Sequence, residues 1–195
     1  MSSPSIGVLA LQGDFREHMA ALGRLGVDAL EVRRVAELER CDGLIIPGGE
    51  STVMQRLAEA YDLFEPIRDA IRAGLPVFGT CAGLIMLADR IQEGIVGQRT
   101  FGGLDVTVRR NAFGNQLDSF EADLAFRGID GPVHAAFIRG PVIQEVGSGV
   151  EILSQLHDGR IVGVRQGQLL GISFHPEVTG EDRIHRLFLD MVTSR

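Results

Sequence analysis

The sequence predicts a three-layer α/β fold in which a mostly parallel or mixed sheet is covered by helices on both faces. In the first hundred of the 195 residues, short apolar runs alternate with helical patterns across short connections, which is typical of a parallel sheet between two layers of helices. After about residue 100 the apolar residues alternate with period two between Gly- and Asp-containing turns. We therefore expect antiparallel strands in the second half.

Periodicity and run length place the elements of the first half. Short apolar runs predict strands, and apolar residues spaced three to four apart predict helices. The predicted strands cover residues 6–11, 27–32, 43–46 and the run that starts at Val77, and the predicted helices cover 15–25, 35–40, 52–60, 63–73 and 84–88.

The second half contains further strand-like runs and closes with an amphipathic helix. The stretch His157-Asp158-Gly159-Arg160 predicts a hairpin turn. Because there is no internal repeat, low-complexity tract or linker, we expect one domain over residues 1–195. The predicted strands cover residues 104–109, 133–138, 150–156, 160–165 and 169–174, and the predicted helix covers 181–192.

Composition excludes several classes of function. The formal net charge is −7 without a run of like charges, so we expect no nucleic-acid partner. No apolar stretch is long enough to span a bilayer, and the N-terminus lacks a signal-peptide pattern, so we expect no membrane association and a cytoplasmic location. All 19 basic residues are arginine. Without lysine, this chain cannot form a Schiff base with a carbonyl substrate.

One stretch predicts a nucleophile. After the strand that starts at Val77, the chain turns at Gly79-Thr80-Cys81-Ala82-Gly83 into a helical pattern. A Gly-x-Cys-x-Gly turn between strand and helix is typical of a nucleophile elbow, which exposes the reactive atom on a strained turn. Backbone N–H groups at the start of the helix would favour a thiolate. This segment alone leaves open the alternative of a buried, unreactive cysteine.

Of the five histidines, His175 is the candidate base. It follows the strand 169–174 and precedes Pro176 and Glu177, at the strand end where α/β sites form. In an extended segment alternate side chains point the same way, so Glu177 would hold one ring nitrogen while the other faces the thiol. A polar surface turn explains His-Pro-Glu equally well by itself. Together with the elbow, the triad Cys81–His175–Glu177 is favoured.

A glycine turn follows the third predicted strand, at Pro47-Gly48-Gly49-Glu50-Ser51. Backbone N–H groups of such a turn can form an oxyanion hole with the N–H group of Ala82, the residue after the nucleophile. Many βα loops contain a Gly-Gly pair. Its significance therefore lies in its expected position at the same sheet edge.

The other histidines and the second cysteine are assigned structural roles. We expect His18 and His185 on solvated helix faces, His157 in a turn, and His134 as a structural residue of a strand. Cys41 has no histidine or glycine turn nearby, so we expect a small structural residue. No metal-ligand spacing occurs, and we expect no metal site.

Three of the segments described above resemble those of the class I, triad-type glutamine amidotransferases. They are Pro47-Gly48-Gly49-Glu50-Ser51, Gly79-Thr80-Cys81-Ala82-Gly83 and His175-Pro176-Glu177. The likeness runs over essentially the whole chain and is most specific for the glutaminase subunits of pyridoxal 5′-phosphate synthases. Many class I relatives have Gln four residues after the nucleophile, whereas this chain has Ile85, as is usual in that branch. Further matching segments are Gly7-Val8-Leu9-Ala10-Leu11-Gln12-Gly13, Arg110-Asn111-Ala112-Phe113-Gly114, Asp118-Ser119-Phe120-Glu121-Ala122 and Phe137-Ile138-Arg139.

The resemblance implies a flavodoxin-like fold and a glutaminase activity without a cofactor. Cys81 would attack the side-chain amide of L-glutamine, with His175 as general base and then acid and Glu177 as its orienting group. The N–H groups of Gly49 and Ala82 would form the oxyanion hole. By the same resemblance, glutamine would be bound by Gly49, Glu50, Ser51, Arg110, Ile138 and Arg139. Which of Arg109, Arg110 and Arg139 contacts it directly stays open.

The resemblance also implies a partner. The ammonia would pass to a (β/α)-barrel pyridoxal 5′-phosphate synthase subunit in a large hetero-oligomer, which would carry out the imine chemistry that a chain without lysine cannot. The edge bearing Gln12, Gly49 and Cys81 would face that partner.

Three alternatives have distinguishable features. A glutaminase subunit of another synthase, such as imidazole glycerol phosphate synthase, would share the triad but is disfavoured by Ile85 and the stretch 110–114. A redox or stress protein with a cysteine elbow would lack the His-x-Glu after a late strand. A non-catalytic binding subunit is disfavoured because all three triad positions are filled.

Overall fold

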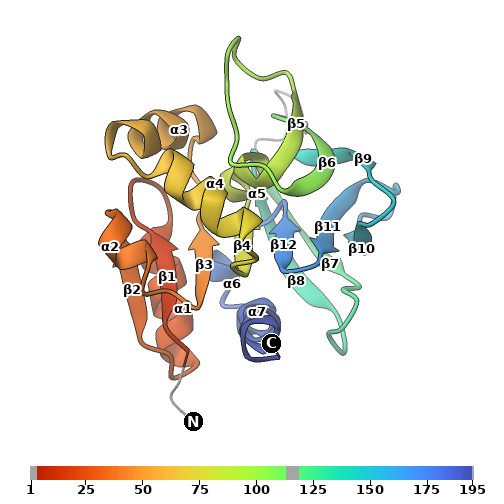
Figure 1. Ribbon diagram of the computed structural model, residues 1–195. Helices are drawn as coiled ribbons and strands as arrows, with labels where there is room; N and C mark the ends of the chain where they lie inside the picture. The colour runs from red at the N-terminus through yellow and green to blue at the C-terminus, as the bar shows by residue number, and fades with distance from the viewer. Residues whose placement is uncertain (1–3, 113–118, 195) are drawn as a thin grey trace.

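The computed structural model describes residues 4–112 and 119–194, and a ten-stranded sheet forms the centre of this part of the chain (Figure 1). The strand order is β2-β1-β3-β4-β12-β11-β9-β6-β5, and β10 pairs with β11. The strands are β1 (Ile6–Leu9), β2 (Ala29–Val32), β3 (Gly43–Ile46), β4 (Val77–Thr80), β5 (Ala88–Gln92), β6 (Leu104–Arg109), β9 (Val142–Val146), β10 (Glu151–Gln155), β11 (Ile161–Gln166) and β12 (Leu169–Ile172).

The sheet is parallel in one half and mixed in the other. Strands β2, β1, β3, β4 and β12 are parallel to their neighbours in this order. Strand β11 is antiparallel to β12, β9 and β10, and β6 is antiparallel to β9. Strand β5 pairs parallel with β6 at the far edge. The prediction of a mostly parallel first half and a mixed, antiparallel second half is confirmed.

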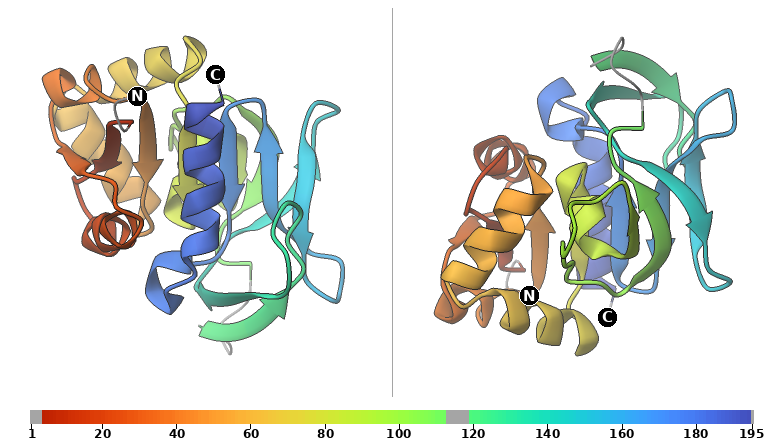
Figure 2. Two further views of the ribbon diagram at one scale, coloured as in Figure 1. Left: turned by 90° about the horizontal axis from the view of Figure 1, so that it is seen from below. Right: turned by 90° about the horizontal axis from the view of Figure 1, so that it is seen from above.

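Helices cover both faces of the sheet, and α7 runs alongside the central strands (Figure 2). Along β3, Leu44 and Ile46 pack into the core with α3, α4 and α5, whereas Ile45 packs into the core with α1 and α7. Such alternation buries a strand on both faces. The helices are α1 (Phe15–Arg24), α2 (Val35–Leu38), α3 (Ser51–Ala60), α4 (Phe64–Arg72), α5 (Ala82–Leu87), α6 (Pro176–Thr179) and α7 (Asp182–Thr193).

The register of two parallel strands places the candidate site. In the pairing of β4 with β12, Val77 lies opposite Leu169 and Thr80 lies opposite Ile172. Both strands therefore end at the same edge of the sheet. Cys81 directly follows β4, and His175 lies three residues beyond β12, so two segments far apart in the sequence meet where parallel strands end.

Within residues 4–112 and 119–194, four elements were not predicted from the sequence: β5, β7 (Ser119–Leu124), β9 and α6. Strands β7 and β8 (Val133–Ile138) form a separate two-stranded antiparallel sheet instead of extending the main sheet. The residues Phe113, Gly114 and Asp118 of the resemblance lie outside the described residues. No helix in the described ranges is long and apolar enough to cross a membrane.

Candidate active site

The backbone at Cys81 has the strained geometry of a nucleophile elbow. Cys81 has φ 51° and ψ −105°, a left-handed conformation that costs energy in a residue other than glycine and is typical of functional sites. Its N–H group donates to the carbonyl of Ile172 in β12 at 2.9 Å. A Cβ atom at Gly83 would lie 2.0 Å from the carbonyl oxygen of Ile46. The glycine is thus required where α5 passes close to β3, and the predicted strand–turn–helix is confirmed.

His175 and Glu177 form a short buried hydrogen bond. The Nδ1 atom of His175 lies 2.6 Å from Oε1 of Glu177, and both residues are almost completely buried. The backbone N–H group of His175 donates to the carbonyl of Ala136 in β8 at 2.9 Å, which fixes the position of the imidazole. The predicted pairing is present, but the predicted reason is wrong. Residues 176–179 form the helix α6 instead of an extended segment, with Pro176 in its first turn.

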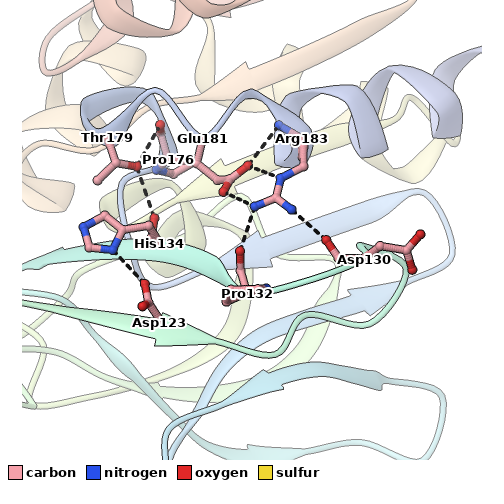
Figure 3. Close-up of polar contacts among 8 residues, drawn as sticks. All are labelled: Asp123, Asp130, Pro132, His134, Pro176, Thr179, Glu181 and Arg183. Carbon is pink, nitrogen blue, oxygen red and sulfur yellow. Dashed lines mark hydrogen bonds and ion pairs between the residues drawn. The ribbon is translucent and has the colours of Figure 1, made fainter.

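The helix α6 is itself fixed to β8 by polar contacts (Figure 3). The hydroxyl of Thr179 donates to the carbonyl of His134 at 3.2 Å. Arg183, at the start of α7, donates to the carbonyls of Asp130 and Pro132 at 2.7 and 2.8 Å. These contacts hold the C-terminal side of α6, and the N–H group of His175 holds its N-terminal side. Together they limit how far the carboxylate of Glu177 can move.

The charges of the site favour an imidazolium. Burial alone lowers the pKa of His175, but its interactions with Cys81 and Glu177 outweigh burial and raise the pKa to about 10. Burial also raises the pKa of Glu177, against the opposing effect of its hydrogen bond with His175. The Nε2 atom of His175 is buried and has no hydrogen-bond partner in the described part of the chain. Contacts between nucleophile and base are commonly long before substrate binds.

The nucleophile and the base share one open cavity of about 520 Å³. This size suits a small-molecule ligand. Of the non-glycine residues with positive φ, Cys81, Asn111 and Arg139 line this cavity, in line with the clustering of backbone strain at functional sites. The lining residues are Asp14, Gly49, Glu50, Ser51, Cys81, Ile85, Arg110, Asn111, Ile138, Arg139, His175 and Val178.

The structure brings together every residue named for glutamine binding. Gly49, Glu50, Ser51, Arg110, Ile138 and Arg139 all line the cavity. Glu177 lies behind His175, and Ala82 is buried directly after the nucleophile. Asp14, Ile85, Asn111 and Val178 also line the cavity but were not named as site residues from the sequence. The position of Asp14 shortly after β1, at the same sheet edge, was a signal that could have identified it.

Arg110 is a cation of the cavity wall that is held by neighbouring side chains. Its Nη2 atom lies 2.9 Å from Oε1 of Glu50, and its Nη1 atom donates to Oε1 of Gln98 at 2.9 Å. Glu50 also caps α3 by accepting from the N–H groups of Thr52 and Val53 at 3.0 and 2.8 Å. Although partial burial opposes it, these bonds and Arg110 lower the pKa of Glu50. The pair therefore presents a fixed cation and a fixed carboxylate to the cavity.

The predicted oxyanion turn is held by the side chain of Gln12. Its Oε1 atom accepts from the backbone N–H group of Glu50 at 3.0 Å. Gly49 has φ 140°, and a Cβ atom there would lie 2.2 Å from the same oxygen. Only glycine suits this position, so the turn brings bare backbone close to the cavity that contains Cys81.

One cluster of potential metal ligands occurs in the described part of the chain. It consists of Asp14, His175 and Glu177, whose donor atoms lie within 4.8 Å of one another. The Nδ1 atom of His175 lies 3.4 Å from Oδ2 of Asp14 and 2.6 Å from Glu177. A protonated Nδ1 that donates to a carboxylate offers no lone pair to a metal. The hydrogen bond between His175 and Glu177 explains why these potential ligands lie close together.

Two of the predicted histidine assignments are wrong. His18 and His185 were expected on solvated faces, but neither has exposed surface. Their helices α1 and α7 pack on each other and on β4, which helical periodicity alone cannot show. His157 lies in the predicted turn. Cys41 is partly buried, and burial raises the pKa of its thiol to about 11, which fits the structural assignment.

Comparison with known proteins gives consistent matches. The model of the SNO glutamine amidotransferase family matches residues 8–194. A Nocardioides protein named pyridoxal 5′-phosphate synthase subunit PdxT is 59% identical over 196 residues, covering 98% of each chain. A Parafrankia protein of the same name is 59% identical over 195 residues, covering 100% of this chain and 96% of that protein.

A solved structure agrees with these matches. The crystal structure of a glutamine amidotransferase superimposes with a TM-score of 0.90 at 50% sequence identity. It covers 96% of this chain and 98% of the other. The similarity thus extends over the whole fold, including both strands that carry the candidate triad.

Proposed function

The chain belongs to the SNO glutamine amidotransferase family, and from this premise we propose that it is a glutaminase subunit of a pyridoxal 5′-phosphate synthase. It hydrolyses L-glutamine to L-glutamate and ammonia and delivers the ammonia to the synthase subunit. The observation that carries the proposal is the buried His175–Glu177 hydrogen bond of 2.6 Å in the cavity of the strained Cys81.

The proposed mechanism follows from the positions of the three side chains. The thiolate of Cys81 attacks the side-chain amide carbon of glutamine and forms a tetrahedral oxyanion. Glu177 holds His175 so that Nε2 faces the reacting atoms, and the imidazolium protonates the departing nitrogen. Breaking the C–N bond releases ammonia and leaves a thioester. His175 then takes a proton from water, which attacks the thioester and releases glutamate.

The backbone supplies the electrostatic part of the mechanism. The N–H groups of Gly49 and Ala82 are proposed to stabilise the oxyanion. The bare backbone at Gly49 and the position of Ala82 directly after Cys81 support this assignment.

Substrate binding is assigned to the polar wall of the cavity. The guanidinium of Arg110 suits the α-carboxylate of glutamine, and the carboxylate of Glu50 suits its α-ammonium group. Gly49, Ser51, Ile138 and Arg139 complete the proposed site, since all of them line the same cavity.

The partner is proposed to be a (β/α)-barrel synthase subunit within a large hetero-oligomer. The names of the relatives support a synthase partner. The lack of lysine in this chain assigns any imine chemistry to the partner. We place the reaction in the cytoplasm, where the free thiols of Cys41 and Cys81 stay reduced.

Glutamine hydrolysis by two triad variants and one control variant tests the proposal. Cys81→Ala and His175→Asn are expected to lose nearly all activity, by about 10²-fold or more for the base, in the presence of the synthase subunit. Cys41→Ala removes the other thiol, outside the cavity, and is expected to keep wild-type activity. Hydrolysis at the wild-type rate by either triad variant contradicts the mechanism.

A further inference from the structure

A chain of buried polar side chains adjoins the candidate triad, and the mechanism above does not use it. His18 from α1 and His185 from α7 have no exposed surface. The Nδ1 atom of His18 lies 2.9 Å from Nε2 of His185, and the Nε2 atom of His18 lies 3.1 Å from the hydroxyl of Thr80. Thr80 directly precedes Cys81, so the chain of contacts reaches the elbow.

The same chain reaches the carboxylate of the triad. The Nε2 atom of His18 lies 3.7 Å from Oε1 of Glu177, the oxygen that also contacts Nδ1 of His175 at 2.6 Å. This oxygen therefore lies between two imidazoles. The other carboxylate oxygen, Oε2, is buried and has no hydrogen-bond partner among the described residues. A buried carboxylate depends strongly on the few donors near it.

Both histidines of this buried series of contacts, His18 and His185, are neutral at neutral pH. Burial, with smaller contributions from His185 and His175, lowers the pKa of His18 well below its ordinary value. Burial lowers the pKa of His185 to about 4, while Asp182 raises it and Arg24 lowers it by smaller amounts. A neutral donor can support Glu177 without competing for its charge against the imidazolium of His175.

The neighbours of each nitrogen indicate the tautomer. A neutral imidazole has one N–H donor and one acceptor. The carboxylate of Glu177 and the hydroxyl of Thr80 both lie at Nε2 of His18, which favours a proton on that atom. Its Nδ1 atom then accepts from Nε2–H of His185. The N–H groups thus point from α7 through α1 towards the triad.

We propose that His18, held in place by His185, is a positioning residue of the triad. Its Nε2–H group orients the carboxylate of Glu177 and the hydroxyl of Thr80, and thereby the imidazole of His175 relative to Cys81. The inference rests on the proposed function, because it concerns the same reaction. His18 does not line the substrate cavity and acts only through these neighbours.

Simple core packing is the competing explanation for the two histidines. Their rings contact the ring of Phe78 edge-on, with centroids 6.2 and 5.6 Å away, and Phe188 contacts the same ring at 5.7 Å. A packing role would change stability but not the ionisation of the active site. The pH dependence of kcat/KM therefore separates the two explanations.

Two amide substitutions separate the roles of the two ring nitrogens of His18. In His18→Gln the amide nitrogen reaches the position of Nε2, so it can still hydrogen-bond Thr80 and face the carboxylate of Glu177. In His18→Asn the shorter amide reaches only the position of Nδ1 and keeps a partner for His185. We expect kcat of glutamine hydrolysis to fall about 10- to 100-fold in His18→Asn, since a misplacement of about 1 Å can cost this much, and much less in His18→Gln.

The pH profile is the second readout, measured with the synthase subunit present. A carboxylate free to turn stabilises the imidazolium less, so the limb of kcat/KM assigned to His175 moves to lower pH in His18→Asn. The limb stays in place in His18→Gln, and KM for glutamine stays near wild type in both. If His18→Asn does not fold, His185→Phe removes the donor to His18 and is expected to shift the same limb.

Two controls complete the experiment. Phe188→Leu loosens the same core without touching the polar chain, so it is expected to lower Tm while keeping kcat and the pH profile. Wild-type kcat and pH profile in folded His18→Asn, or a shifted limb in Phe188→Leu, overturns the inference. Full activity in Cys81→Ala, or none in the wild type, would instead overturn the proposed function.

Discussion

At the scale of single residues, the site depends on a balance between burial and pairing. His175 and Glu177 are both almost fully buried, and burial opposes the charged form of each. Pairing with Cys81 and Glu177 nevertheless raises the pKa of His175. The result is a proton donor available at neutral pH, which is what expulsion of ammonia from an amide requires.

Arg110 provides a test of substrate binding at this scale. Arg110→Ala is expected to raise KM for glutamine about 10- to 100-fold, as expected for the loss of a charged hydrogen bond of about 1.5–3 kcal/mol, and to lower kcat much less. Steady-state kinetics measures both. Arg99→Ala is the matched control, because Arg99 pairs with Glu59 and Glu65 and does not line the cavity. An unchanged KM in Arg110→Ala would remove this residue from the proposed site.

The site residues that were identified from the sequence are those that lie in recognisable local motifs. Cys81 lies between two glycines after an apolar strand, and His175 precedes a proline and a carboxylate. His18 and His185 carry no such local signal, because their burial depends on α1 packing against α7. Asp14 was missed because no local motif marks it, and only its position after β1 at the same sheet edge could have indicated it.

At the scale of elements, the elbow depends on close approach of two backbones. Gly83→Ala would place a Cβ atom 2.0 Å from the carbonyl of Ile46, so α5 must shift. We expect a loss of about 1–3 kcal/mol in the free energy of unfolding, measured by urea denaturation, together with lower kcat.

Gly23→Ala is the matched control for this substitution. Gly23 lies inside α1, and a Cβ atom there meets nothing within 4 Å. Alanine is expected to stabilise the protein by about 0.5–1 kcal/mol because it favours the helix. Unchanged stability and activity in Gly83→Ala would show that the elbow tolerates a side chain and contradict this account.

The strands with clear apolar runs were predicted, but β5, β7, β9 and α6 were not. β3, β6 and β8 have the predicted bounds. β5 (Ala88–Gln92) is mostly exposed, so its sequence resembles a loop. β7 alternates exposed residues with half-buried or buried ones, a period-two pattern that the prediction missed. α6 is a single turn of helix beginning at a proline. Its structure is fixed by contacts with β8 and α7, which are distant in sequence or follow the helix, and not by its own four residues.

At the scale of the whole molecule, the helices α1 and α7, which lie far apart in the sequence, pack against each other. α1 and α7 are joined on the surface by Arg24 and Asp182 at 2.7 Å and in the interior by His18 and His185 at 2.9 Å. No local pattern could predict this contact, since it follows from the order of the strands. It links the packing of the fold to the triad.

This buried pair predicts an acid-sensitive component of stability. The folded-state pKa of His185 is about 4, below the unfolded value of about 6.5, so the unfolded chain binds more protons between these values. The stabilisation is fully present above about pH 6.5 and is lost as pH falls towards about 4. The lowered pKa of His18 acts in the same direction.

Comparison with a variant isolates this component from the titration of other groups. The stability advantage of the wild type over His185→Phe is expected to shrink by on the order of 3 kcal/mol between about pH 7.5 and pH 4, since one pKa unit is worth about 1.4 kcal/mol. Thermal or urea unfolding across this range measures it. The difference between the wild type and Phe188→Leu is expected to stay constant with pH. A constant difference for His185→Phe as well would contradict the prediction.

The most direct test of the central claim is formation of pyridoxal 5′-phosphate by this chain mixed with a pyridoxal 5′-phosphate synthase subunit and the other substrates of that subunit. With glutamine as nitrogen source, the wild type is expected to support product formation and Cys81→Ala is not. With an ammonium salt in place of glutamine, both mixtures are expected to form product. Product formation from glutamine by Cys81→Ala at the wild-type rate, or none by the wild type, would contradict the account.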